Sequence, residues 1–403
     1  MLVLVINCGS SSLKFQLVAD DEDRSAPLPR GAIERIGTPP STIELVDSKG
    51  VRLCDTDHVP DHADAGWRVI QWLDEQQALA DLSAVGHRVV HGGSLFAESV
   101  LIDKEVIRAI DRLGELAPLH NPPALASMKA VRKLLGDAMP MVAVFDTAFH
   151  QSMPAWAAQY AIDGEWARKH QVRRYGFHGT AHRYLSERYD TLTGTPNRQS
   201  KLISLQLGNG CSATAVQAGE SVDTSMGLTP LEGLMMGTRS GDVDPTLAQV
   251  YARREGVAIE QAEIWLNSRC GLLGVSGSSS DMRDLLAARS RGEKRAALAV
   301  QMYCYRVRKM IGAYLAALGG AEAVVFGGGI GENSPEIRRL ICAGMEWCGL
   351  QLDPDRNKTT VGLEGRISTD EADIAAYVIP VDEALCIARE TMACLETRTA
   401  REG

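Results

Sequence analysis

A strand–glycine turn–strand unit occurs twice in the chain, and this repeat limits the possible folds more than any other feature. Residues 2–6 are a continuous apolar run, residues 7–12 are rich in Gly and Ser, and residues 13–18 are mostly apolar. The same layout recurs over residues 202–216, with a Gly-Asn-Gly turn at 208–210. A short turn of this kind between two apolar runs predicts a β-hairpin. We therefore expect an internal duplication in which one hairpin opens each domain.

Helices and strands are predicted to alternate near the C-terminus. Apolar side chains fall on one face of a helix over residues 300–318, and residues 323–326 form a short apolar strand. A glycine loop is expected at 327–331, and Asn333 or Ser334 can cap the helix that follows. Strand, glycine loop and helix in this order predict an α/β fold.

The composition allows two domains and argues against some partners. The chain has 403 residues, which favours two domains over one. Its net charge of −9 does not suit a nucleic-acid-binding surface, which is normally basic. An anionic substrate remains possible, because exposed charges far from a cleft are screened within about 10 Å.

The cysteines and the N-terminus predict a cytoplasmic protein without a membrane segment. Nine cysteines are scattered without a CxxC pair, so neither a disulfide framework nor a zinc site is expected. The apolar start at residues 1–6 has no basic flank and ends at Asn7. That run is too short for a signal peptide or a membrane-spanning helix, and it predicts a buried strand.

Three glycine turns that follow strands are candidate phosphate sites. Glycine lets the backbone approach a ligand closely, so that successive N–H groups converge on anionic oxygens. An ordinary tight turn is the alternative for each of them. The chain has no GxxxxGK[ST] motif, which excludes a P-loop enzyme. Gly208-x-Gly210-x-x-Ala213 matches a relaxed dinucleotide fingerprint, but a strand-like segment follows it where a helix is required.

Two arginines lie in glycine-rich surroundings. Arg88 lies within residues 86–93 and Arg239 within residues 237–242. An arginine flanked by small residues can present its guanidinium as a bidentate donor to a carboxylate or phosphate. A structural ion pair with a nearby aspartate is the alternative for each.

A carboxylate and a histidine are further candidates for chemistry. Asp146 directly follows a predicted strand at 141–145, the position where α/β proteins place functional groups. A helix-capping aspartate is the other interpretation. His178 lies in a loop between Gly176 and Gly179, where a functional role and a structural one are both open.

Taken together, these segments resemble the family of acetate kinases, the acetokinase family of short-chain carboxylate kinases. The matching segments follow the order of the family: residues 7–15, 86–93, 117–122, 145–150, 175–180, 223–233, 237–245 and 327–334. The resemblance implies the duplicated, ribonuclease H-like α/β fold of actin and sugar kinases, with two domains and a central cleft. We expect an N-terminal acyl-kinase domain at 1–150, completed by a C-terminal helix at about 383–403. A nucleotide-binding domain at 151–382 would be the second.

The resemblance implies reversible, Mg²⁺-dependent phosphoryl transfer from ATP to acetate, with Mn²⁺ as a substitute ion. Asn7, Asp146 and Glu383 would surround the metal. Arg88 and Arg239 would hold the carboxylate and the transferring phosphoryl group, together with His178 and Asp146 as catalytic residues. The implied walls of the acyl pocket are Val90, Leu119, Phe177 and Pro230. The implied ATP-binding residues are Lys14, Gly208, Asn209, Gly210, Asp281, Met282, Arg283, Gly329, Ile330 and Asn333.

The chain departs from the family pattern at two places. Gln206 stands where the family usually has histidine, and a glutamine cannot become cationic. Before Glu383 the chain reads Pro380-Val381-Asp382, where the family usually has Thr-Asn-Glu after its proline. A propionate kinase of the same family and a nucleotide-driven conformational ATPase remain alternatives, and a dinucleotide oxidoreductase is a more distant one. The family also implies a homodimer.

Overall fold

Both predicted hairpins are present in the computed structural model of the protein. The first pairs β1 (Leu2–Cys8) with β2 (Ser12–Ala19), and the second pairs β9 (Lys201–Leu207) with β10 (Cys211–Gln217). Both pairs are antiparallel. The structure describes residues 1–19, 27–117, 120–195 and 199–402. No helix in these ranges is long and apolar enough to cross a membrane.

The chain divides into two units, and the first consists of Met1–Phe149 together with Asp382–Gly403. The other strands of unit 1 are β3 (Arg30–Glu34), β4 (Ser41–Val46), β5 (Arg52–Asp57), β6 (Leu82–Val89), β7 (Val100–Leu101) and β8 (Met141–Phe145). Its helices are α1 (His62–Glu75), α2 (Lys104–Arg112), η1 (Leu113–Glu115), α3 (Asn121–Leu135) and α15 (Glu383–Glu402). The short helix η2 (Ala148–His150) lies at the boundary.

Unit 2 consists of His150–Val381. Its other strands are β11 (Glu220–Thr224), β12 (Ala323–Gly327), β13 (Gly365–Arg366) and β14 (Ala375–Val378). Its first helices are α4 (Ala155–Ala158), α5 (Gly164–Lys169), α6 (Gly179–Thr193), α7 (Thr246–Glu255), α8 (Ile259–Ser268) and α9 (Gly271–Ser276). The remaining helices are α10 (Met282–Ser290), α11 (Lys294–Leu318), α12 (Gly328–Asn333), α13 (Pro335–Cys342), η4 (Glu346–Cys348) and α14 (Pro354–Thr359).

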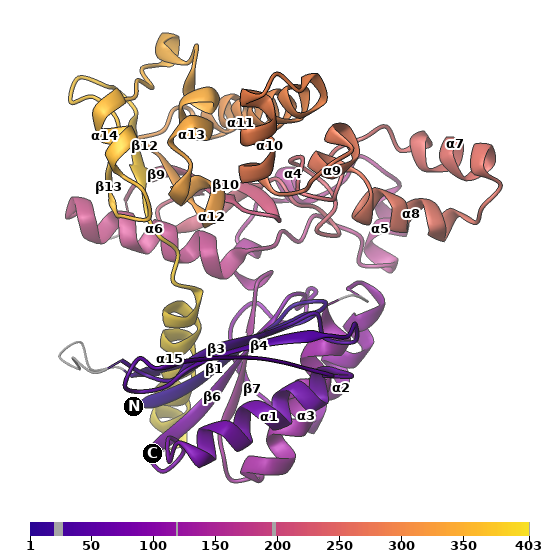
Figure 1. Ribbon diagram of the computed structural model, residues 1–403, viewed down its shortest axis with the longest axis vertical. Helices are drawn as coiled ribbons and strands as arrows, with labels where there is room; N and C mark the ends of the chain where they lie inside the picture. The colour runs from indigo at the N-terminus through magenta and orange to yellow at the C-terminus, as the bar shows by residue number, and fades with distance from the viewer. Residues whose placement is uncertain (20–26, 118–119, 196–198, 403) are drawn as a thin grey trace. The chain divides into compact units, whose positions relative to one another are not determined.

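The two units share one sheet topology, as the repeated hairpins predict (Figure 1). In unit 1 the order β3-β2-β1-β6-β8 begins with antiparallel strands and continues with the parallel pairs β1–β6 and β6–β8. In unit 2 the order β11-β10-β9-β12-β14 has the same sequence of antiparallel and parallel pairs. A short antiparallel strand, β7 or β13, completes each sheet on the same side. The duplication is therefore confirmed at the level of topology.

Alternation along β1 decides which side chains of unit 1 reach the candidate site. Leu4 and Ile6 belong to the apolar core formed with α1 and α3. Val3 and Val5 point to the opposite face of the sheet and pack against α15. Because side chains alternate between faces along a strand, Asn7 falls on the α15 face as the next member of that row. This face therefore carries apolar residues along most of its length and polar residues at one end.

Gly86 allows α15 to approach the sheet closely. A Cβ atom at Gly86 would lie 2.4 Å from Thr391 Oγ1 and 2.9 Å from Ile387 Cγ2, both on α15. We expect Gly86→Ala to destabilise the protein by about 1–3 kcal/mol, because an added methyl group in a packed contact forces displacement.

The matched control is Gly312→Ala in α11, where an added Cβ meets nothing within 4 Å. That control should be neutral or stabilising, since alanine favours a helix by about 1 kcal/mol over glycine. Scanning calorimetry of both variants tests this, and equal melting shifts would contradict it.

Most elements predicted near the C-terminus are confirmed. The helix over 300–318 is the C-terminal part of α11, which ends at Gly319 in a left-handed conformation. Ser334 caps α13 and accepts a hydrogen bond from the Ile337 backbone N–H. The predicted glycine loop at 327–331 is wrong, because Gly328–Asn333 form the helix α12. Gly328 adopts φ +74°, and a Cβ there would lie 2.7 Å from Leu207 O. The glycine thus serves the close approach of α12 to β9 and does not form an open loop.

Candidate active site

In unit 1 three polar side chains line up across neighbouring strands. Arg88 on β6 is the register partner of Asn7 on β1, and Lys14 on β2 is the partner of Asn7 on its other side. Register partners project from the same face of a sheet. Asp146 directly follows β8, the strand next to β6, and its backbone N–H donates to Val89 O. The sheet register therefore brings together residues that are far apart in sequence.

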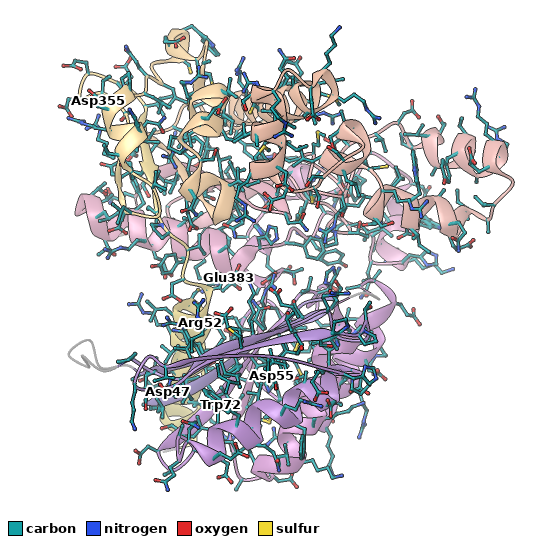
Figure 2. The ribbon with its side chains drawn as sticks, in the orientation of Figure 1. Asp47, Arg52, Asp55, Trp72, Asp355 and Glu383 are labelled. Carbon is teal, nitrogen blue, oxygen red and sulfur yellow. The ribbon has the colours of Figure 1, made fainter. Side chains whose placement is uncertain are left out.

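Hydrogen bonds join four of the predicted residues into one chain. Arg88 donates from Nε to Asp146 Oδ1 at 3.0 Å and from one terminal nitrogen to Asp146 Oδ2 at 2.5 Å. Its other terminal nitrogen donates to Asn7 Oδ1 at 2.9 Å. Asn7 Nδ2 in turn donates to Glu383 Oε2 at 3.0 Å. Glu383 opens α15, where Figure 2 labels it.

The sequence left open that Arg88 forms a structural ion pair with an aspartate. The structure contains such a pair, between Arg88 and Asp146. The Asp146 side chain is fully buried and that of Arg88 is 14% exposed. Burial would lower the pKa of Arg88, but the carboxylates of Asp146 and Glu383 outweigh it and raise the pKa. Arg88 therefore stays cationic, with three of its N–H groups engaged by Asp146 and Asn7. The other two of its five N–H groups donate to no group that the structure describes and can serve a ligand.

The predicted metal ligands form an all-oxygen donor set that suits a hard cation such as Mg²⁺. Both Asp146 oxygens and the Asn7 side-chain oxygen already accept from Arg88. Such a set fits a magnesium ion that keeps several of its own waters, which is its usual state in proteins. In the described residues there is no group of three or more His, Cys, Asp or Glu side chains that could hold a metal. The fit thus depends on an amide together with two carboxylates.

In unit 2 Arg239 is a half-buried cation without a paired carboxylate among the described residues. One terminal nitrogen donates to Pro230 O at 3.2 Å and contacts Met236 Sδ at 3.7 Å. Asp242, the nearby aspartate in its motif, accepts instead from the Gly233 backbone N–H at 2.7 Å. Burial lowers the pKa of Arg239, and no charged neighbour within the described ranges offsets this effect. A cation desolvated in this way is stabilised when an anion binds.

A second arginine holds the segment that carries Pro230 and Arg239. Arg174 donates to the successive carbonyls of Thr224, Ser225 and Met226 and to Glu232 Oε1 at 2.6 Å. The Glu232 carboxylate also accepts from the Tyr160 hydroxyl. These contacts hold the loop after β11 in place. The sequence motif alone did not predict them.

The Gly208–Gly210 turn between β9 and β10 contacts both the loop that carries Arg239 and the side chain of His178. The Gly237 backbone N–H donates to Asn209 O at 2.9 Å, which places the Arg239 loop against the turn. A Cβ at Gly210 would lie 3.2 Å from Cε1 and Nε2 of His178, so the imidazole ring packs on the same turn. His178 adopts φ 56° and ψ 26° before α6. A non-glycine residue is uncommon in this left-handed region, and residues held there cluster at functional sites.

Gln206 lies beside this turn on β9. It is the register partner of Ser212 on β10 and of Gly327 on β12. Its side-chain oxygen is buried and has no hydrogen-bond partner among the described residues. The amide therefore offers an unsatisfied polar group next to the turn, without any charge of its own.

A cavity of about 650 Å³ in unit 2 brings together most of the predicted nucleotide residues. Its predicted lining residues are Gly208, Asn209, Asp281, Met282, Arg283, Gly329, Ile330 and Asn333, and its other lining residues are Ser280, Leu286 and Ser334. Asp281 caps α10 and pairs with Arg283 at 2.6 Å. Gly210 does not line the cavity, and Lys14 belongs to unit 1.

The predicted acyl-pocket residues fall in both units. Val90 in unit 1 and Phe177 in unit 2 are buried, and Pro230 in unit 2 is half-buried. Pro230 is joined to Arg239 through its carbonyl oxygen. Leu119 lies outside the described residues.

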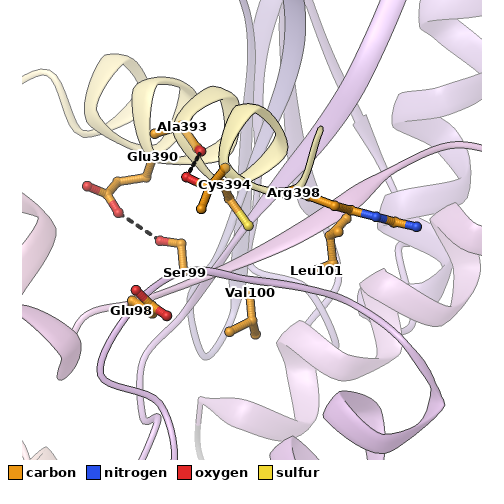
Figure 3. Close-up of a pocket in the computed structure, with 9 residues that line it drawn as sticks. Glu98, Ser99, Val100, Leu101, Glu390, Ala393, Cys394 and Arg398 are labelled. Atoms are coloured by element: carbon orange, nitrogen blue, oxygen red, sulfur yellow. Dashed lines mark hydrogen bonds between the residues drawn. The ribbon is translucent and has the colours of Figure 1, made fainter. Parts of the chain in front are cut away.

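A second cavity of about 440 Å³ in unit 1 has no counterpart in the sequence predictions (Figure 3). It lies between α15 and the segment of β7, where Ser99 Oγ donates to Glu390 Oε2 at 2.8 Å. Cys394 is the nucleophilic side chain of its lining. Burial, with the charges of Glu98 and Glu390, raises the pKa of the Cys394 thiol. A raised thiol pKa disfavours the reactive thiolate, so Cys394 is a poor nucleophile at neutral pH.

Several residues of the candidate site were missed at the level of sequence. Ser204 on β9, Ser212 on β10 and His182 on α6 form a buried polar cluster with His178. The available signals were the one-turn spacing of the two histidines and polar residues on one face of otherwise apolar strands. Leu286 follows Met282 by one helical turn and could have been found in the same way.

The fold, with one mixed sheet in each of two α/β units, is that of solved kinases. The family model of the acetokinase family matches residues 2–389. A curated acetate kinase of Solibacter usitatus is 50% identical, with 98% of each chain covered. The crystal structure of Porphyromonas gingivalis acetate kinase gives a TM-score of 0.90 at 42% identity, covering 98% of this chain and 99% of that chain. That of a propionate kinase from Francisella tularensis subsp. tularensis gives 0.90 at 38% identity, covering 96% and 98%.

The chain belongs to the acetokinase family. It has the fold of the solved acetate kinases and is a kinase, that is, a phosphotransferase.

Proposed function

We propose that the protein catalyses reversible, Mg²⁺-dependent transfer of the γ-phosphoryl group of ATP to acetate, giving acetyl phosphate and ADP by direct in-line transfer. One observation carries the proposal. The Gly208–Gly210 turn contributes to the wall of the nucleotide-sized cavity and also contacts the Arg239 loop and the His178 ring. Phosphates bound at the turn would therefore lie near Arg239, a cation without a carboxylate partner in the described part of the chain.

The charges of the reactants explain why arginines are needed. A carboxylate has a pKa near 4–5, so it is already an anion at neutral pH and requires no general base. Its attack on a phosphoryl group is opposed by repulsion of about 4 kcal/mol for two unit charges 4 Å apart at an effective dielectric near 20. Fixed positive charges lower this barrier. We assign this role to Arg239 and to the two remaining N–H groups of Arg88.

Asn7, Asp146 and Glu383 would hold the magnesium ion. When bound, the ion neutralises negative charge on the phosphate oxygens. Asp146 organises Arg88 and the metal's water shell and does not abstract a proton. Glu383 fixes the orientation of the Asn7 amide through its hydrogen bond.

A hydroxamate assay tests the proposal. The protein is incubated with ATP, Mg²⁺, hydroxylamine and one of acetate, propionate or butyrate, and acyl phosphate is trapped as the hydroxamate. We expect acetate to be the preferred acid and propionate to react within about 10–200-fold of it, because one methylene changes binding by about 1–3 kcal/mol. A preference for propionate would support the propionate-kinase alternative instead, the activity by which the similar Francisella tularensis protein is named. ATP hydrolysis without hydroxamate from any acid would overturn the proposal and favour a conformational ATPase.

A further inference from the structure

A buried chain of alternating histidines and serines lies behind His178 in unit 2. Ser212 Oγ lies 2.8 Å from His178 Nδ1 and 2.8 Å from His182 Nε2. The other ring nitrogen of His182, Nδ1, lies 2.7 Å from Ser204 Oγ. Ser204, Ser212 and His182 are each completely buried. The hydrogen-bonded order is therefore His178, Ser212, His182 and Ser204.

His182 is neutral, and this limits how protons can be arranged along the chain. Burial, with the nearby imidazoles of His150 and His178, holds the pKa of His182 well below its usual range. A neutral imidazole has one N–H donor and one acceptor nitrogen. Since both nitrogens of His182 face serine hydroxyls, one serine must donate to the ring and the other must accept from it. Two directions of hydrogen bonding let each member donate to the next along the whole series.

In the first direction every donor points toward His178. Ser204 donates to His182 Nδ1, His182 Nε2–H donates to Ser212, and Ser212 donates to His178 Nδ1. A neutral His178 then carries its proton on Nε2, the nitrogen that packs on the Gly208–Gly210 turn. His178 is thus a hydrogen-bond donor without being charged.

In the second direction every donor points away from His178. His178 Nδ1–H donates to Ser212, Ser212 donates to His182 Nε2, and His182 Nδ1–H donates to Ser204. Ser204 can donate its own hydroxyl hydrogen bond to Thr214 O, 3.4 Å away. In this direction His178 has a proton on Nε2 only when it is cationic.

Phosphoryl oxygens only accept hydrogen bonds, so a partner at the turn must be a donor. We propose that Ser212, His182 and Ser204 act as a reversible relay that keeps a proton on His178 Nε2 whether His178 is neutral or cationic. The relay runs in the first direction for neutral His178 and in the second for cationic His178. Ser212 and His182 are thus positioning residues for phosphoryl transfer, and the inference rests on the proposed function.

A second histidine, His150, and an uncharged amide, Gln206, face the cluster. His150 faces His182, with ring centroids 5.9 Å apart, and its Nε2 donates to Phe177 O at 3.0 Å. Its Nδ1 lies 2.8 Å from Ser221 Oγ. Gln206, the register partner of Ser212, cannot change its charge.

The pH dependence of turnover distinguishes a relay from a purely structural contact. Without Ser212, neutral His178 can carry its proton on either nitrogen, whereas cationic His178 still has Nε2–H. We expect turnover of Ser212→Ala to approach the wild-type value at low pH. The ratio of wild-type to variant turnover should rise about two- to tenfold as His178 loses its proton, the range that corresponds to one hydrogen bond. Taking the ratio removes the pH dependence of the substrates, and the KM for ATP should change less than about twofold.

Ser186→Ala is the matched control. Ser186 is a buried serine on α6, and its hydroxyl has no hydrogen-bond partner among the described residues. Its turnover should equal that of the wild type at every pH. A pH-independent ratio for Ser212→Ala, or an equal loss in Ser186→Ala, would overturn the relay.

Nitrogen-15 NMR of the wild-type protein gives a test that does not depend on turnover. The imidazole signals are recorded with Mg²⁺ and a non-hydrolysable ATP analogue, and His178 is identified by the signal lost in His178→Gln. We expect neutral His178 to be protonated on Nε2, with His182 neutral throughout the pH range. A neutral His178 protonated on Nδ1 would overturn the inference even if Ser212→Ala does not fold. A hydroxamate assay without product from any acid would instead overturn the proposed function. It would not change the His178 tautomer measured by NMR.

Discussion

Arg239→Leu is expected to lower turnover by about a thousandfold or more while leaving nucleotide binding nearly unchanged. An arginine that stabilises a transferring phosphoryl group contributes on the order of 10³–10⁵ to turnover in other phosphotransferases. Arg239 has the required property, since its guanidinium is desolvated and pairs with no carboxylate among the described residues. It does not line the nucleotide cavity, so the affinity for ATP should depend on it little. Turnover from initial rates and ATP affinity from calorimetric titration measure the two effects.

Arg239→Lys is the matched control for that prediction. Lysine keeps the positive charge but cannot present the planar bidentate donor of arginine. Its turnover should fall between those of the wild type and Arg239→Leu. Wild-type turnover in Arg239→Leu would remove this residue from the chemistry, and a parallel loss of ATP affinity would assign it to nucleotide binding.

Arg338→Met is expected to destabilise unit 2 by about 3–5 kcal/mol and to raise the KM for ATP. Arg338 is completely buried, and burial lowers its pKa only to about 10, so it is charged at neutral pH. Its five N–H donors reach the carbonyls of Gly331, Glu332, Asn357 and Thr360 and the Asn357 side chain. Each acceptor left buried and unsatisfied costs about 1–3 kcal/mol, which relaxation and water entry then reduce.

The effect on ATP follows from where these acceptors lie. Gly331 and Glu332 are in α12, which also supplies Gly329, Ile330 and Asn333 to the nucleotide cavity. Hydrogen exchange of α12 and α14 amides should therefore accelerate in Arg338→Met. Arg291→Met is the control, because its ion pair with Glu293 at 2.9 Å is exposed and such pairs contribute about 0–1 kcal/mol. Equal melting shifts in the two variants would contradict the assigned role of Arg338.

Features that depend on residues close together in the sequence were predicted correctly. The hairpins that open each unit, the strand β8 before Asp146, the long helix α11 and the cap at Ser334 are all confirmed. Each rests on apolar periodicity, turn composition or a capping side chain, which act over a few residues. The error at 327–331 has the same origin. Glycine disfavours a helix locally, and contact of α12 with β9 outweighs that preference here.

The sequence by itself determined the family, the duplicated hairpins and the identity of the charged side chains. Only the tertiary structure decided their partners. Sheet register places Arg88 beside Asn7, and α15 returns from the end of the chain to set Glu383 against Asn7. It also showed that Arg88 is held by Asp146 whereas Arg239 has no such partner among the described residues. Nothing in the local sequence distinguishes these two arginines, because pairing of buried charges depends on long-range packing and desolvation.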